Sequence, residues 1–128
     1  MRIEHIGIWT RDLEMMRTFY TTFFKLKSND LYVNSEKGFS SYFLSFSSGA
    51  RLELMHSIHR ESKENSIDEL TGLAHIAISL GSKSSVLNLT EELREKGFKI
   101  VGEPRTTGDG YFESVIEDPE GNNIELTI

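Results

Sequence analysis

Hydrophobic and polar residues alternate with the period of a β-strand in several segments of the chain, and two other segments repeat hydrophobic residues at helical spacing. The strand-like segments are residues 2–9, 30–34, 40–47, 50–57, 73–80, 98–102, 111–117 and 123–128. One predicted helix follows Thr10 or Asp12, either of which suits an N-cap. The other spans about 83–96 and ends before Gly97, a residue typical of the position after a helix. Each half of the chain is therefore predicted to be β-α-β-β-β.

Two short stretches of the first half recur in the second half, in the same order. EHIGIW is matched by AHIAIS, so His5 corresponds to His75. Further along, RLEL is matched by NIEL, which aligns Glu53 with Glu125. Because both stretches recur at nearly the same offset, they indicate a duplicated structural unit.

The duplication predicts a single α+β domain over residues 1–128, made of two modules. The first module covers about 1–57 and the second about 72–128. Residues 58–71 are mostly polar, show no apolar period and are predicted to be the linker. Residues 118–122, DPEGN, carry the proline and glycine of a tight turn between the last two predicted strands.

Strand alternation places the four repeated polar residues opposite the apolar faces of their strands. In EHIGIW and AHIAIS the isoleucines share one face, and His5 and His75 point to the other. In RLEL and NIEL the aliphatic residues share one face, and Glu53 and Glu125 point to the other. Each module is thus expected to have one face suited to packing under its helix and one face bearing a histidine and a glutamate.

Two neutral imidazoles and two carboxylates are suitable ligands for a divalent cation, and the two carboxylates balance its charge. A single histidine or glutamate in a strand is more often hydrogen-bonded or half-exposed than a ligand, so the metal hypothesis depends on all four recurring together. Gly7 and Ala77 are small neighbours that would leave room for the ion. His56 and His59 lie outside the repeat and are interpreted as surface or loop histidines.

Composition narrows the classes of function. The chain has 128 residues, no cysteine and a formal net charge of −6. The lack of cysteine excludes disulfides, thiolate metal sites and a cysteine nucleophile. The acidic balance argues against a nucleic-acid partner, and no apolar stretch approaches the roughly 20 residues of a membrane span. The N-terminus does not have the pattern of a signal peptide, so we expect a cytoplasmic protein without a membrane partner.

The sequence resembles the vicinal oxygen chelate superfamily, which contains glyoxalase I, bleomycin-resistance proteins, extradiol dioxygenases, thiol transferases that inactivate fosfomycin, and methylmalonyl-CoA epimerase. The resemblance covers essentially the whole chain and is most specific in HIGIW followed by RDL and FY, in AHIAIS, and in EDPEGNNIEL. It implies paired βαβββ modules that form a curved mixed sheet around a divalent metal, with the helices on the convex face. Carried over residue by residue, it implies His5, Glu53, His75 and Glu125 as the metal ligands.

The resemblance is strongest to a small bacterial glyoxalase, which implies lyase or isomerase chemistry on the hemithioacetal of a 2-oxoaldehyde and a thiol. It implies zinc or nickel as the cofactor, with cobalt, manganese or iron as alternatives, Glu125 as the catalytic base with Glu53 as the second candidate, and a homodimer. An epimerase or thiol transferase on the same scaffold, and a protein that binds an antibiotic or metabolite without reaction, are the alternatives. The sequence departs from the family at the end of the first helix, Phe24-Lys25-Leu26-Lys27, where members usually have a glycine, and its second strand has no clear arginine to hold a glutathione carboxylate.

Overall fold

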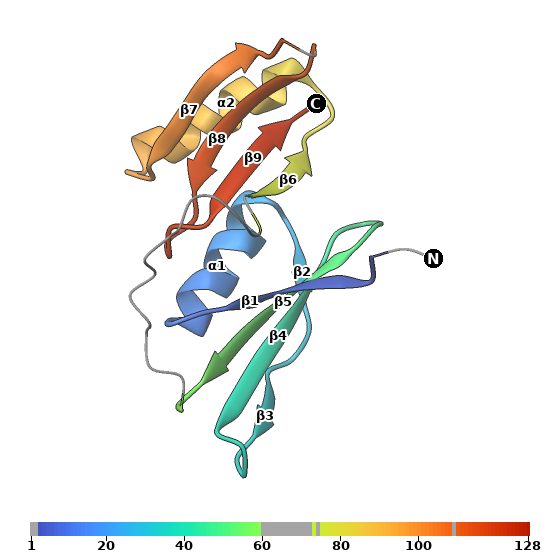
Figure 1. Ribbon diagram of the computed structural model, residues 1–128, viewed down its shortest axis with the longest axis vertical. Helices are drawn as coiled ribbons and strands as arrows, with labels where there is room; N and C mark the ends of the chain where they lie inside the picture. Colours follow the sequence, from blue (N-terminus) through green and yellow to red (C-terminus); the bar gives the residue numbers. More distant parts are fainter. Residues whose placement is uncertain (1–2, 60–72, 74, 109) are drawn as a thin grey trace. The chain divides into compact units, whose positions relative to one another are not determined.

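The computed structural model describes residues 3–59, 73, 75–108 and 110–128 (Figure 1). The chain divides into two compact units, Met1–Ile67 and Asp68–Ile128. The predicted linker lies almost entirely outside the described residues. Both units have α+β structure, with one helix and one mixed sheet each, as the sequence predicts.

The first unit contains a five-stranded sheet and one helix. Its elements are β1 (His5–Trp9), α1 (Leu13–Phe23), β2 (Lys27–Ser28), β3 (Tyr32–Asn34), β4 (Phe39–Ser45) and β5 (Arg51–Ser57). The strand order is β1-β5-β4-β2, and β3 also pairs with β4. The first strand lies beside the last, β5, and is parallel to it, while β4 and β5 form an antiparallel hairpin.

The second unit repeats this topology with a four-stranded sheet. Its elements are β6 (Ile76–Ser79), α2 (Lys83–Glu95), β7 (Ile100–Thr106), β8 (Phe112–Glu117) and β9 (Asn123–Thr127). The strand order is β6-β9-β8-β7, with β6 parallel to β9. The first strand of each unit thus pairs with the last strand of the same unit.

The second strand of the repeat differs from the prediction in both units. In the first unit it is divided into β2 and β3, because the side chain of Asn29 accepts the backbone N–H of Phe43 at 2.7 Å in place of a regular ladder bond. In the second unit, β7 continues past the predicted end at residue 102 and includes Pro104. Proline is tolerated there because β7 is an edge strand whose register shifts between Gly102 and Arg105.

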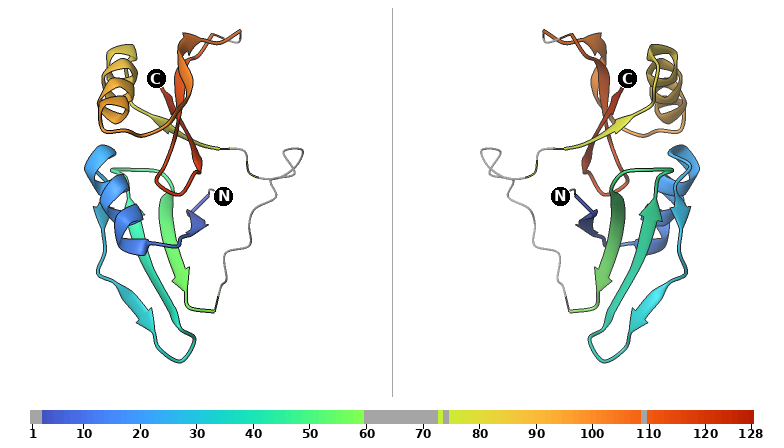
Figure 2. Two further views of the ribbon diagram at one scale, coloured as in Figure 1. Left: turned by 90° about the vertical axis from the view of Figure 1, so that its left-hand side faces the viewer. Right: turned by 90° about the vertical axis from the view of Figure 1, so that its right-hand side faces the viewer.

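Each helix covers one face of its own sheet, as the two views of Figure 2 show. Helix α1 begins at Asp12, whose carboxylate accepts the N–H of Met15 at 2.9 Å, so Asp12 rather than Thr10 is the N-cap. Its buried residues Met16, Phe19 and Tyr20 recur at helical spacing. They pack on the sheet face formed by alternate residues of the strands, including Leu44, Leu52 and Leu54.

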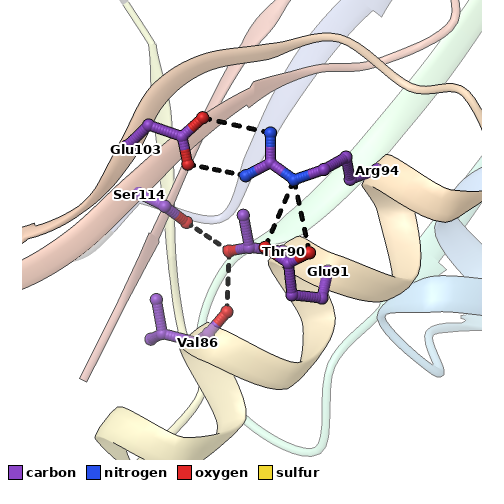
Figure 3. A network of polar contacts seen from close by, with 6 residues as sticks. All are labelled: Val86, Thr90, Glu91, Arg94, Glu103 and Ser114. Carbon is purple, nitrogen blue, oxygen red and sulfur yellow. Dashed lines mark hydrogen bonds and ion pairs between the residues drawn. The ribbon is translucent and has the colours of Figure 1, made fainter.

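Helix α2 is joined to its sheet by a polar network in addition to apolar packing (Figure 3). Thr90 is fully buried, donates to the carbonyl of Val86 at 2.7 Å and accepts from Ser114 on β8 at 2.7 Å. At the helix surface, Arg94 forms a two-pronged contact with Glu103 on β7, at 3.0 and 2.6 Å. Because Thr90 and Ser114 satisfy each other, this buried pair avoids the cost of an unpaired hydroxyl.

The two helices end differently, and the difference falls at Lys25. Helix α2 ends in a Schellman motif, in which Gly97 has φ 84° and Phe98 N–H donates to the carbonyl of Leu93 at 3.0 Å. After α1, the corresponding left-handed position is taken by Lys25, with φ 56°. Lys25 is the one described non-glycine residue in this conformation, which is sterically unfavourable for a residue with a Cβ.

Replacing Lys25 with glycine should therefore raise the free energy of unfolding by about 0.5–1 kcal/mol. Removal of the Cβ relieves the strain of the left-handed conformation, and this gain exceeds the entropic cost of a more flexible unfolded chain. Urea denaturation followed by the fluorescence of Trp9, the single tryptophan, measures the change in the unit that contains it. Lys25→Ala is the matched control, since it keeps the Cβ and loses the Nζ contact with the carbonyl of Thr22 at 2.6 Å. A glycine variant less stable than the alanine variant would contradict this explanation.

Within the part of the chain that the structure describes, neither helix has the length and apolar character needed to cross a membrane.

Candidate metal centre

The candidate ligands of the first unit lie on the sheet face that α1 leaves open. Along β5 the residues alternate between buried Leu52 and Leu54 and partly exposed Glu53. On the neighbouring parallel strand, Gly7 is directly opposite Glu53. His5 is therefore a diagonal neighbour of Glu53 on the same face.

This geometry brings one imidazole and one carboxylate together in the first unit. Nε2 of His5 is 3.6 Å from Oε2 of Glu53. The ring of His5 also packs edge-on against Phe43, with centroids 5.4 Å apart. Glu53 is mostly covered, with 17% of its side chain exposed, so its charge is not freely solvated on this face.

The second unit contains the same arrangement in the same register. Ala77 on β6 is directly opposite Glu125 on β9, as Gly7 is opposite Glu53. Nε2 of His75 is 3.5 Å from Oε2 of Glu125. Glu125 is covered to a similar extent, with 19% of its side chain exposed.

The distances within each pair fit two ligands of one cation. Zinc–nitrogen and zinc–oxygen bonds are about 2.1 Å, so two ligands of a tetrahedral ion are roughly 3.4 Å apart. The observed separations of 3.6 and 3.5 Å are close to this value. The donor set of imidazole nitrogen and carboxylate oxygen is also one that divalent transition metals accept. Each pair is therefore suited, by distance and by donor type, to provide two ligands of a divalent cation.

The described residues contain no group of three or more histidine, aspartate or glutamate side chains placed to hold an ion. Each unit by itself brings together one candidate pair. His56 and His59 do not join the first pair. His56 lies on the helix-facing side of β5 and its Nδ1 is 3.1 Å from the carbonyl of Thr10, and His59 is exposed in the turn after β5.

His5 has two further neighbours, Glu4 and Arg51, that strand alternation did not single out. Nδ1 of His5 is 2.6 Å from Oε2 of Glu4, and the other carboxylate oxygen of Glu4 accepts from Nε of Arg51 at 2.8 Å. The hydrogen bond with His5 is the main cause that holds the pKa of Glu4 below its ordinary value; desolvation opposes it, and the contact with Arg51 lowers the pKa further. The signal that could have identified this cluster is the pairing of β1 with β5, which brings Glu4, just before β1, beside Arg51 at the start of β5.

The small residue Gly7 does not leave open space in the first unit. A Cβ built on Gly7 would lie 2.7 Å from Cε of Met55, so the methionine methyl group occupies the space that the sequence predicted to be free. Because this methyl group is the end of a flexible side chain, a Cβ at residue 7 would displace it without moving the backbone. Trp9, on the same sheet face, is 41% exposed and packs edge-on against Phe39 with centroids 6.1 Å apart.

The chain is a member of a known superfamily. Residues 2–126 match the Glyoxalase/Bleomycin resistance protein/Dioxygenase superfamily, to which the protein therefore belongs. This confirms the family that the sequence resembles, and with it the α+β fold of two related modules.

Among individual proteins, the chain is 28% identical to the uncharacterized protein YqjT of Bacillus subtilis (strain 168), an alignment that covers 97% of this chain and 96% of YqjT. It also resembles the crystal structure of glyoxalase I from Zea mays, with a TM-score of 0.80, 26% identity and 98% of this chain covered. The match spans 44% of the maize chain, less than half its length. Glyoxalase I of Leishmania major, described as trypanothione-dependent, matches with a TM-score of 0.76 and 25% identity over 99% of this chain and 86% of that enzyme.

Proposed function

We propose that the protein is a divalent-metal enzyme of the glyoxalase type, with His5, Glu53, His75 and Glu125 as the metal ligands. The observation that carries this proposal is the duplicated pair. Each unit places one imidazole Nε2 3.5 or 3.6 Å from one carboxylate oxygen, on the sheet face opposite its helix and in the same register. A neutral donor and an anionic donor, paired in the same way in both units, are suited to binding a cation.

When bound, a divalent cation would stabilise the negative charge that develops on the substrate oxygens during proton abstraction. Zinc and nickel suit two imidazoles and two carboxylates, and the same ligands accept cobalt, manganese or iron. Glu53 and Glu125 together carry the two negative charges that offset the ion. His5 and His75 supply neutral nitrogen donors and leave the net charge of the site near zero.

The proposed substrate is the hemithioacetal of a 2-oxoaldehyde and a thiol. Glu125 takes the proton from the carbon that bears sulfur and returns it to the adjacent carbonyl carbon. The hydroxyl proton moves to the neighbouring oxygen at the same time, so the product is the thioester of a 2-hydroxy acid and no redox partner is needed. Glu53 is the second candidate for this role, because it occupies the matching place in the other unit.

Purified protein should contain about one equivalent of divalent metal per chain. His5→Ala and His75→Ala should each lose most of this metal, because a site with three ligands holds the ion less tightly than a site with four. Elemental analysis after gel filtration measures the metal content. His59→Ala is the matched control, since this histidine is exposed in the turn after β5, belongs to neither pair, and its removal should leave the metal in place. Metal-free wild-type protein that also fails to take up zinc or nickel on titration would contradict the proposal.

The reaction is tested separately, by following the disappearance of the hemithioacetal formed from methylglyoxal and a thiol. Turnover that depends on added metal supports the glyoxalase assignment. Metal binding without turnover of any hemithioacetal would instead favour the epimerase, the thiol transferase or the ligand-binding protein among the alternatives. The homodimer that the family resemblance implies is checked in the same preparation by its mass in solution.

A further inference from the structure

We propose that Glu4 is a positioning residue for His5: it fixes the orientation of the imidazole ring and keeps the proton on Nδ1, so that the lone pair of Nε2 faces Glu53. The inference rests on the proposed function, since it concerns one of the proposed metal ligands. The proposed role distinguishes the two units, because the second unit has no carboxylate at the position that corresponds to Glu4.

Glu4 is held at both its backbone and its side chain by Arg51 of the neighbouring strand. Its backbone carbonyl accepts the N–H of Arg51 at 3.0 Å, and its Oε1 contacts Nε of Arg51 at 2.8 Å and the terminal guanidinium nitrogen at 2.5 Å. The guanidinium group in turn lies over the ring of Phe43, 4.1 Å from its centroid. This leaves Oε2 of Glu4 directed at His5, which packs against the same phenylalanine.

The chemistry of the contact fixes the tautomer of His5. An ionised carboxylate can only accept a hydrogen bond, so at 2.6 Å from Oε2 of Glu4 the nitrogen Nδ1 must carry the proton. In a neutral imidazole the other nitrogen then has the lone pair. That nitrogen, Nε2, is the one 3.6 Å from Glu53. A carboxylate that holds the remote nitrogen of a ligating histidine in this way fixes the ring and raises its basicity as a donor.

The second unit lacks counterparts of both Glu4 and Arg51. Residue 74, which corresponds to Glu4, is alanine, and residue 123, which corresponds to Arg51, is asparagine. An alanine side chain cannot accept a proton from His75. The repeat therefore conserves the histidine and glutamate of each pair but not the group behind the histidine, so the two histidines are expected to differ in how firmly they are oriented.

A role in stability alone does not explain the arrangement. Glu4 is about half exposed, with 55% of its side chain accessible, and ion pairs this exposed contribute little to folding. Carboxylates behind ligating histidines, by contrast, typically change metal affinity by about 10- to 100-fold. Loss of Glu4 is therefore expected to change metal affinity much more than stability. The Glu4→Met variant should accordingly fold normally.

The experiment compares wild type, Glu4→Met and Glu103→Met. Glu103 is the matched control, because it also forms a two-pronged contact with an arginine, Arg94, but touches no histidine. Two-bond proton–nitrogen correlation spectra of metal-free, histidine-labelled protein at about pH 8.5, where an imidazole of ordinary pKa is neutral, report which ring nitrogen carries the proton. The His5→Ala and His75→Ala variants assign the signals. Zinc affinity is then measured by competition with a chelator.

We expect wild-type His5 to be protonated at Nδ1, and Glu4→Met to shift it towards a mixture of both tautomers while His75 stays unchanged. Zinc affinity should fall by about 10- to 100-fold in Glu4→Met and remain unchanged in Glu103→Met. A wild-type His5 protonated at Nε2, or an unchanged zinc affinity in Glu4→Met, would overturn the positioning role and leave the metal proposal intact. Failure of the wild-type protein to bind metal would overturn both, and the wild-type titration alone reveals it.

Discussion

Replacing Glu125 with glutamine should leave the metal bound and lower the turnover of the hemithioacetal by about 10²- to 10⁴-fold, the usual contribution of a general base. Glutamine has nearly the same shape as glutamate and keeps a carbonyl oxygen as a ligand, but it cannot take up a proton at neutral pH. The metal content of the purified variant and the rate of hemithioacetal loss, measured on the same preparation, separate loss of the ion from loss of the base.

Glu53→Gln is the matched variant for this experiment. Glu53 and Glu125 occupy corresponding strands, face the same kind of neighbour across the parallel pair, and lie 3.6 and 3.5 Å from their histidines. We expect the Glu53 variant to retain more activity, since the family resemblance favours Glu125 as the base. Full turnover in Glu125→Gln would remove that residue from the role, and loss of turnover in Glu53→Gln alone would transfer the role to Glu53.

Much of the fold was predictable because strand periodicity and the internal repeat are local signals. Alternation along RLEL and NIEL was enough to separate the buried aliphatic residues from Glu53 and Glu125, and the burial of β5 and β9 agrees. The repeat then linked each glutamate to a histidine in the same half of the chain. The helix predicted in the second half ends before Gly97, as expected, because this glycine takes the left-handed backbone conformation that follows the last turn.

The features that the sequence did not reveal depend on pairing between distant segments. The 3.6 Å separation of His5 and Glu53 follows from the register of β1 on β5, the first and last strands of the unit, and alternation alone does not specify that register. Glu4 and Arg51 meet for the same reason. The division of the second strand by Asn29 depends on a side chain that replaces a backbone partner, which no periodicity records.

Replacing Asp118 with alanine should lower the free energy of unfolding by about 1.5–3 kcal/mol, the usual cost of removing hydrogen bonds to a charged group. Asp118 is only 4% exposed and its carboxylate organises the turn before β9. It accepts the backbone N–H groups of Glu120 and Asn122 at 3.0 and 2.9 Å, and the side-chain amide of Asn122 at 2.8 Å. Urea denaturation followed by far-ultraviolet circular dichroism measures the loss.

Asp118→Asn separates the backbone contacts from the charge. Its carbonyl oxygen still accepts both N–H groups of the turn, but its amide cannot accept from the Asn122 amide, so we expect a smaller loss of about 1 kcal/mol. An alanine variant within about 0.5 kcal/mol of wild type would mean that water satisfies these donors. The turn sets the pairing of Glu117 with Asn123, and a one-residue slip in this pairing would move Glu125 to the helix-facing side. Because the asparagine side chain still accepts both N–H groups of the turn, we expect Asp118→Asn to keep its metal. The turn that stabilises the second unit is thus the same feature that directs the proposed base to the open face.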